Sequence, residues 1–228
     1  MLNEENEEVK KYSRLSDGIR VDLKLVAALV DPNARVLDVG CGDGSLLRYL
    51  VEKKNVDGRG LEISQSGVRA CLLQGLSVVQ GDADTDLKNY PSGAFDFVVL
   101  SETLQTTHNP LVVLQELVRI GRFAIVSFPN FGYWRCRWQL LVHGHMPVTK
   151  SLPLPWHATP NIHFSTIADF LDTCAEKNIS VERSYAVNQR GEPIRFGGGR
   201  FYPNIFGAQG VFLLTAGAST TADELVAG

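Results

Sequence analysis

The chain has 228 residues, 44% of them hydrophobic and 21% charged, which is an ordinary composition for a globular protein that buries a full core. Its net charge of −3 provides no general attraction to a phosphate backbone, so composition argues against a nucleic-acid partner. The acidic start has no apolar signal-peptide region and no run approaches membrane-spanning length, so we expect a soluble cytoplasmic protein without membrane association.

We expect a single domain over residues 18–215, because the chain is short enough for one core and has no internal repeat. Residues 1–17 form a polar N-terminal segment, and residues 216–228 are small and polar enough to predict a disordered tail. The four cysteines lie at least 30 residues apart and form no C-x-x-C pair, which is typical of reduced cytosolic thiols.

The first regular elements are a helix over residues 21–30 and, after a turn at Pro32, a strand over residues 35–39. Helical and strand-like patterns then alternate, which predicts a parallel sheet built from right-handed crossovers. Thr166 and Asp169 predict a capping box at the start of a later helix. In chain order the further elements are helix 44–53, strand 57–62, helix 64–74, strands 76–80 and 95–101, helix 109–119, strand 122–128, helix 166–177, and strands 179–187 and 210–215.

A glycine-rich turn follows the first strand. Gly40, Gly42 and Gly44 come directly after Asp38, where the chain must turn sharply from the strand into a helix. A side chain at Gly40 or Gly42 would occupy the space that a ligand needs, and Cys41 between them is a small residue of the turn. The helix that follows is expected to turn its unpaired N–H groups toward the same space. The strand, the turn and the start of the helix therefore predict a cradle for a nucleoside cofactor.

The spacing of this turn differs from the dinucleotide fingerprint G-x-G-x-x-G, because the third glycine comes one residue early. Asp38 would repel a pyrophosphate but suits the ammonium group of a methionine moiety. The D-x-G-x-G-x-G pattern resembles motif I of the class I S-adenosylmethionine (SAM)-dependent methyltransferases. The resemblance implies a Rossmann-like α/β fold, with a mostly parallel seven-stranded sheet, helices on both faces and an antiparallel last strand. It also implies SAM, or its demethylated product S-adenosyl-L-homocysteine, as the cofactor.

The next two strands also lead into acids, Glu62 and Asp82. Ligands of open α/β sheets bind at the carboxyl ends of the strands, so both acids are expected to face the same crevice as Asp38. The resemblance assigns Glu62 to the two ribose hydroxyls, and Asp82 with the N–H of Ala83 to the amino edge of adenine. In the same topology the fourth strand ends near Ser101, which puts that residue at the mouth beside the cofactor.

A long connection over residues 129–164 interrupts the alternation, and connections of this length are usually functional. Within it, four residues follow the i, i+4, i+7, i+8 spacing of an amphipathic helix: Trp134, Trp138, Leu141 and Val142. The stripe has three interpretations, namely a lid over the ligand pocket, a surface that docks on a partner, and ordinary core packing. The neighbouring arginines lie off the stripe, so the aromatic and basic residues do not predict single-strand nucleic-acid binding.

Five segments carry a closer resemblance: residues 36–44, 100–105, 126–135, 146–148 and 159–163. Together they resemble the MetW family of bacterial methionine-biosynthesis proteins, over about residues 14–212. The resemblance implies a role in methionine synthesis as a partner or activator of homoserine O-acyltransferase, and it implies no particular methyl acceptor. The stretch 188–203 is longer than the family pattern, and we expect its glycine triplet at 197–199 to be a flexible turn.

Methyl transfer requires alignment of the acceptor and often a base. The candidate catalytic residues are Glu102, at the end of the fourth strand, and His163, in the insert. Each has alternatives to a catalytic role. Glu102 could instead bind the methionine end of the ligand or be a solvated acid, and His163 could be a structural hydrogen-bonding residue. His143 and His145 lack a nearby acid or cysteine, so no metal site is predicted. Two functions stay open: a SAM-binding partner of the acyltransferase, and a SAM-dependent methyltransferase that acts on a small molecule.

Overall fold

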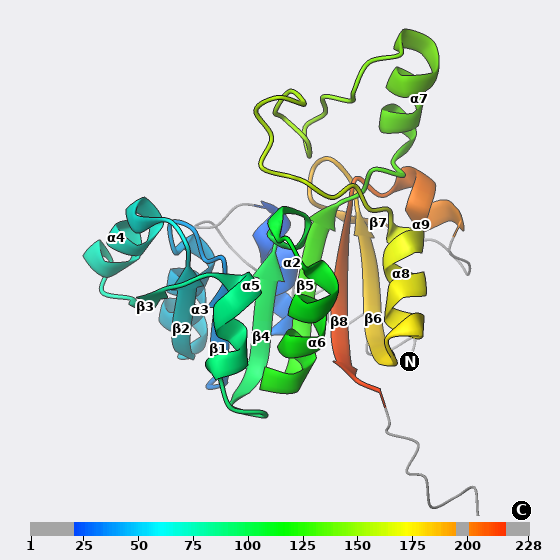
Figure 1. The fold of residues 1–228 in the computed structure, drawn as a ribbon. Helices are drawn as coiled ribbons and strands as arrows, with labels where there is room; N and C mark the ends of the chain where they lie inside the picture. Colours follow the sequence, from blue (N-terminus) through cyan, green and yellow to red (C-terminus); the bar gives the residue numbers. More distant parts are fainter. Residues whose placement is uncertain (1–20, 195–200, 218–228) are drawn as a thin grey trace, which may run out of the picture.

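The computed structural model of the protein describes residues 21–194 and 201–217. Its strands are β1 (Arg35–Val39), β2 (Asp57–Glu62), β3 (Ser77–Gln80), β4 (Phe95–Ser101), β5 (Gly121–Pro129), β6 (Ile179–Val187), β7 (Pro193–Ile194) and β8 (Gln209–Ala216). They form one sheet in the order β3-β2-β1-β4-β5-β8-β6-β7 (Figure 1). Strands β1 to β5 are parallel, and β8 runs antiparallel to both of its neighbours. The expected Rossmann-like class, with its antiparallel last strand, is confirmed.

The sheet contains eight strands among the described residues, and the expected number of seven is wrong by one. The extra strand, β7, pairs antiparallel with the end of β6. Between them the side-chain oxygen of Asn188 accepts hydrogen bonds from the backbone N–H groups of Arg190 and Glu192, at 2.8 and 3.0 Å. Such a polar turn into a two-residue strand has no hydrophobic alternation, so periodicity gives no signal for it. The predictions for residues 1–17 and 197–199 lie outside the described residues, and so does the predicted disordered tail 216–228 except for its first two residues. Of these, Ala216 is the last residue of β8, so the tail was predicted to begin too early.

Helices cover both faces of the sheet, as Figure 1 shows. The helices are α2 (Val21–Leu29), α3 (Ser45–Lys54), α4 (Gln65–Leu73), α5 (Ala83–Asp86), α6 (Pro110–Ile120), α7 (Trp134–His143), α8 (Ile167–Glu176) and α9 (Phe201–Phe206), with 3-10 turns η1 (Leu87–Asn89) and η2 (Leu104–Thr106). Alternate residues of β4 serve two cores, because successive side chains of a strand point to opposite faces. Val99 packs with Leu50 of α3 on one face, and Val98 packs with Leu117 of α6 and Phe170 of α8 on the other.

The long predicted helices all occur, with ends that differ from the expected ones by a residue or two. The capping box at the start of α8 is confirmed: the Thr166 hydroxyl accepts the N–H of Asp169, whose carboxylate accepts the N–H of Thr166. Four short elements, α5, η1, η2 and α9, were not expected from the sequence, because they are too short to show a helical period.

The insert between β5 and α8 leaves the sheet at its carboxyl edge. Figure 1 shows α7 standing beyond this edge, followed by an irregular segment that returns over the sheet to α8. At its base, Tyr133 and Cys136 pack with Leu152 and Ala208 in a small separate core. The insert therefore lies on the same edge of the sheet as the acids and glycines singled out above.

Candidate cofactor-binding site

The turn after β1 has a backbone that requires its glycines. Gly40, Gly42 and Gly44 have φ angles of 69°, 56° and 79°, in the left-handed region that side chains disfavour. A Cβ atom on Gly40 would lie 2.5 Å from Oγ1 of Thr103, whereas a Cβ atom on Gly42 would meet no atom within 4 Å. The turn thus packs tightly against the end of β4 at Gly40 and faces open space at Gly42.

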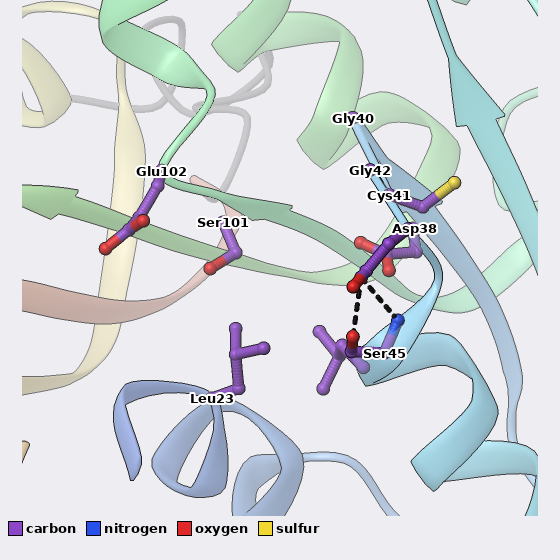
Figure 2. Close-up of a pocket in the computed structure, with 10 residues that line it drawn as sticks. Leu23, Asp38, Gly40, Cys41, Gly42, Ser45, Ser101 and Glu102 are labelled. Atoms are coloured by element: carbon purple, nitrogen blue, oxygen red, sulfur yellow. Dashed lines mark hydrogen bonds between the residues drawn. The ribbon is translucent and has the colours of Figure 1, made fainter. Parts of the chain in front are cut away.

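The first N–H group of α3 is already occupied. Asp43 accepts hydrogen bonds from the N–H and the hydroxyl of Ser45, at 3.0 and 2.5 Å, and these are the dashed lines in Figure 2. The sequence predicted that unpaired N–H groups at this helix start would face the ligand. For Ser45 that prediction is wrong, because the carboxylate of Asp43 takes the place that an anionic ligand group would need.

Asp38 is a buried carboxylate, with only 3% of its surface exposed. Among the described residues, no hydrogen bond to its side chain is present. Burial, and next the nearby charge of Glu62, raise the pKa of Asp38 from 3.8 to about 7. A carboxylate in this setting lacks a cation, and an ammonium group placed beside it would supply one.

Asp38 lines a cavity of about 280 Å³. Figure 2 shows it with Cys41 and Ser45 on one side of this cavity, Ser101 and Glu102 on the other, and Leu23 of α2 beneath. The remaining lining residues are Gly40, Gly42, Asp43 and Leu46. Six of the predicted site residues, those numbered 38, 40, 41, 42, 101 and 102, therefore meet around one space.

A second cavity, of about 330 Å³, shares Gly40 with the first. Asp82 and Ala83 line it together with Asp84, and the carboxylate of Asp82 caps α5 by accepting the N–H of Asp84 at 2.9 Å. Its other walls come from the ends of β2 and β3, the η2 region and the insert, through Leu61, Ile63, Gly81, Thr103, Thr106, Thr107, His108 and Pro160. The two cavities therefore adjoin at the glycine turn, through Gly40.

Glu62 is hydrogen-bonded to the turn and lines neither cavity. Its two carboxylate oxygens accept the N–H groups of Gly42 and Ser64, each at 2.8 Å, and 7% of its surface is exposed. A Cβ atom on Gly67 would lie 2.8 Å from Cγ of Glu62, so the glycine makes room for this side chain. The carboxylate is held rigidly, and each oxygen keeps a lone pair for a further donor. Gly44 also lines neither cavity: a Cβ atom there would collide with Leu76.

The two candidate catalytic residues lie in different surroundings. Glu102 has a left-handed φ of 55°, lines the first cavity, and accepts a hydrogen bond from the side-chain amide of Gln209 on β8. The neighbouring hydroxyls of Ser101 and Ser127 are hydrogen-bonded at 2.9 Å. The exposed imidazole of His163 lines neither cavity, although the backbone N–H of His163 donates to the carbonyl of Gln105 at 3.1 Å.

The cysteine in the turn has the character of a packing residue. The sulfur atoms of Cys41 and Cys71 lie 3.8 Å apart, and both residues are buried. Burial raises the pKa of both thiols, which keeps them protonated and weakly nucleophilic. Across the described ranges, no group of three or more His, Cys, Asp and Glu residues is placed to hold a metal ion.

Sequence reasoning missed several wall residues of the second cavity. Asp84 anchors the loop before α6 by accepting the N–H groups of His108 and Asn109, at 2.8 and 2.7 Å. Thr103 and Pro160 reach the cavity from the end of β4 and from the insert. Asp84 lies two residues past Asp82, close enough for a search around that acid to find it, but no local signal marks Thr103 or Pro160.

The strand order, the antiparallel β8 and the glycine turn after β1 together define the class I methyltransferase fold. A chain from the complex between the Haloferax volcanii Trm112 methyltransferase activator and a methyltransferase superposes with a TM-score of 0.62 at 17% identity, covering 86% of this chain and 89% of that chain. A SAM-dependent methyltransferase from Thermotoga maritima gives a TM-score of 0.61 at 20% identity, covering 95% and 96%. At these identities the likeness shows the fold alone.

The particular family follows from the sequence comparisons. The family model "Methionine biosynthesis protein MetW" matches residues 20–214, so the chain belongs to the MetW family, as predicted. A curated relative, the bifunctional methionine biosynthesis protein MetXA/MetW of Rhodopirellula baltica, is 33% identical over 173 residues, or 72% of this chain. The matched region spans only 28% of that relative's length.

Proposed function

We propose that the protein binds SAM, or S-adenosyl-L-homocysteine, across the two adjoining cavities. The observation that carries this proposal is Asp38, because a buried carboxylate without a described hydrogen-bond donor matches the ammonium group of the methionine moiety. Asp82 and Ala83 line the second cavity, where they suit the adenine edge. Glu62, which we assign to the ribose, lines neither cavity, but it is hydrogen-bonded to the N–H of Gly42 in the turn and its oxygens keep lone pairs for the ribose hydroxyls. The open space at Gly42 and the cavity volumes fit a ligand of this size.

The protein acts, in this proposal, in methionine biosynthesis as a partner and activator of homoserine O-acyltransferase. The Rhodopirellula baltica relative supports it, because its name joins MetXA, which we take to be the acyltransferase, with MetW. Two domains linked in one chain have a high effective concentration for each other, which favours their association and is typical of proteins that work together. We place this activity in the cytoplasm, where the four buried cysteines, all free, stay reduced. None of the described helices has the length and apolar run that crossing a bilayer requires.

SAM binding gives this partnership a regulatory purpose. SAM is made from methionine, so a partner that binds it can relay the level of the end product to an early enzyme of the pathway. A coupling free energy of about 1–3 kcal/mol between the two binding events, the usual range for linked sites, is sufficient.

The test is an activity assay with purified homoserine O-acyltransferase from the same organism. Acyltransferase activity is measured alone, with this protein, and with this protein plus SAM. We expect activation that changes with SAM, and we expect the Asp38→Asn variant to activate without responding to SAM. An acyltransferase that ignores both the protein and SAM would overturn the proposal.

A second candidate function is methyl transfer to a small molecule, and the position of Glu102 favours it. When bound, SAM supplies an electrophilic methyl group. The Glu102 carboxylate lines the cavity that contains Asp38, at a place from which it can accept a proton from an acceptor. Incubation with methyl-labelled SAM and a metabolite extract tests this function. Labelled product that disappears in the Glu102→Gln variant would support it, and no labelled product under any growth condition would count against it.

A further inference from the structure

Helix α7 presents an apolar face to solvent. Trp134, Trp138, Leu141 and Val142, which we call the α7 stripe, are 42%, 56%, 82% and 50% exposed. The third tryptophan of the chain, Trp156, lies in the following segment and is 72% exposed. Exposed apolar groups concentrated in this way mark interaction surfaces, since single scattered residues would need no explanation.

The α7 stripe does not pack on the sheet. Figure 1 shows α7 standing clear of the body, and Cys136 is its only buried residue. The stripe also lines neither cavity of the cofactor site. The sequence left three interpretations open. Among the described residues, core packing and a lid over the ligand both lack support, whereas the exposure of the stripe supports docking on a partner.

The charges around the stripe indicate what kind of partner fits. Residues 117–168 contain no Asp or Glu, although the whole chain has a net charge of −3. Arg135 and Arg137 flank the stripe on α7, and the guanidinium of Arg135 lies 5.3 Å from the centre of the Trp134 ring. Tryptophan and arginine are the residues that most often dominate binding energy at interfaces. The matching surface is an apolar groove with an acidic rim.

We propose that the α7 stripe is the surface on which homoserine O-acyltransferase docks. This inference rests on the function proposed above and specifies its interface. The relative from Rhodopirellula baltica favours this occupant over a second copy of the chain, because more than two thirds of its length lies outside the matched region and includes the part named MetXA. The acyltransferase contributes the groove and its acidic rim, and this chain contributes the helix.

The insert also connects the docking surface to the cofactor site. Pro160 lines the second cavity, and the N–H groups of Ile162 and His163 donate to the carbonyl of Gln105, at 2.9 and 3.1 Å. The side-chain amide of Gln105 donates in turn to the carbonyl of Pro129 and the hydroxyl of Ser165, each at 3.0 Å. Both ends of the insert are thereby attached to η2, which contributes Thr106 to the second cavity.

Through these hydrogen bonds, η2 contacts both the ligand cavity and the base of the insert that carries the docking surface. A ligand that orders η2 also orders the base of the insert, so SAM and the acyltransferase alter each other's affinity by the same factor. We expect that factor to be roughly tenfold, within the usual range for linked sites.

The test compares two identical substitutions at equally exposed leucines. Leu141→Asp puts a charge in the centre of the stripe, and Leu73→Asp puts one on α4, where Leu73 is 81% exposed. The affinity of each full-length variant for the purified acyltransferase is measured by titration calorimetry. We expect Leu141→Asp to weaken binding by at least about 30-fold, the effect of losing an interface anchor, and Leu73→Asp to leave it unchanged. Both variants should bind SAM like the wild type.

The outcomes separate this inference from the proposed function. Unchanged acyltransferase affinity in Leu141→Asp would overturn the docking surface and leave the proposed function standing. A wild-type protein that does not bind the acyltransferase at all would overturn both. A wild-type dimer that Leu141→Asp converts to a monomer would assign the stripe to a second copy of the chain. A thermal midpoint lower in Leu141→Asp than in Leu73→Asp would assign the stripe to another part of the same chain, and either result would overturn the inference.

Discussion

Replacing Asp38 with asparagine should make the folded protein more stable and strongly weaken its affinity for SAM. The two effects have one cause. Asp38 has no hydrogen-bond donor in the part of the chain that the structure describes, and a carboxylate in this state, ready to receive a ligand cation, is costly to bury in the free protein. Asparagine has nearly the same shape, carries no charge, and cannot provide an ionic partner for an ammonium group.

The size of the stability effect follows from the pKa of Asp38, which rises from 3.8 to about 7 on folding. Because the folded pKa is raised, the folded protein binds this proton more tightly than the unfolded chain does, and stability falls as the pH rises from 3.8 towards 7. Linkage at 1.36 kcal/mol per pKa unit gives the unfolding free energy that is lost because Asp38 ionises less readily in the folded protein. This loss is about 2 kcal/mol at about pH 5 and about 4 kcal/mol at about pH 8. The Asp38→Asn variant lacks this dependence.

Urea unfolding of both proteins at these two pH values measures the effect. The difference in unfolding free energy between variant and wild type should grow by roughly 2–3 kcal/mol from the lower to the higher pH. Calorimetry with SAM should show that the variant's affinity falls by at least about 30-fold, because a buried charged hydrogen bond is lost. A stability difference that is the same at both pH values would refute the raised pKa, and wild-type SAM affinity in the variant would refute the role of Asp38.

Further predictions concern the same site. The SAM affinity of the wild type should fall about tenfold per unit as the pH decreases below about 7, because the Asp38 carboxyl must lose its proton to pair with the ammonium group; calorimetry over pH measures this. Glu62→Gln should weaken SAM binding and move that midpoint to lower pH, because the charge of Glu62 raises the Asp38 pKa; an unmoved midpoint would contradict the coupling. Gly42→Ala should lose about 1–2 kcal/mol of unfolding free energy in urea from left-handed backbone alone. Gly40→Ala should lose more, because its Cβ also collides with the Thr103 side chain, and equal losses would contradict the packing described. His163→Ala should leave SAM affinity within about twofold of the wild type, because the ring lines neither cavity, and a larger loss in calorimetry would place the ring at the ligand.

The glycine turn and its acids could be predicted from the sequence because their signals are local. A buried strand, an acid and glycines in succession locate Asp38 and the turn, and strand ends locate Glu62 and Asp82. Thr103 and Pro160 reach the second cavity from positions far along the chain, where a threonine after a strand and a proline in a loop carry no distinctive signal. Only the tertiary arrangement of β4 and the insert brings them there.

The exposure of the α7 stripe could not be predicted, for a different reason. Apolar residues that recur with a period of about 3.6 residues show that a helix has one apolar face. The same pattern occurs whether that face packs in a core, covers a ligand or docks on a partner. What decides is where the chain exits the sheet. Because β5 ends at Pro129 and Tyr133 packs in a small core at the base, α7 begins beyond the sheet's edge and its apolar face has no sheet to cover.

The hydrogen bonds at the start of α3 distinguish between a dinucleotide and SAM more clearly than the glycine spacing does. Dinucleotide sites leave the helix N-terminus free for a pyrophosphate, whereas here the carboxylate of Asp43 already accepts the N–H and hydroxyl of Ser45. Asp38 adds a second carboxylate to the same cavity, and the carboxylate of Glu62 accepts the N–H of Gly42 in the turn. A doubly negative pyrophosphate would meet repulsion from all three acids, while the cationic methionine end of SAM would be attracted. The charges of this glycine-rich turn therefore favour a cation over a phosphate, in agreement with its glycine spacing.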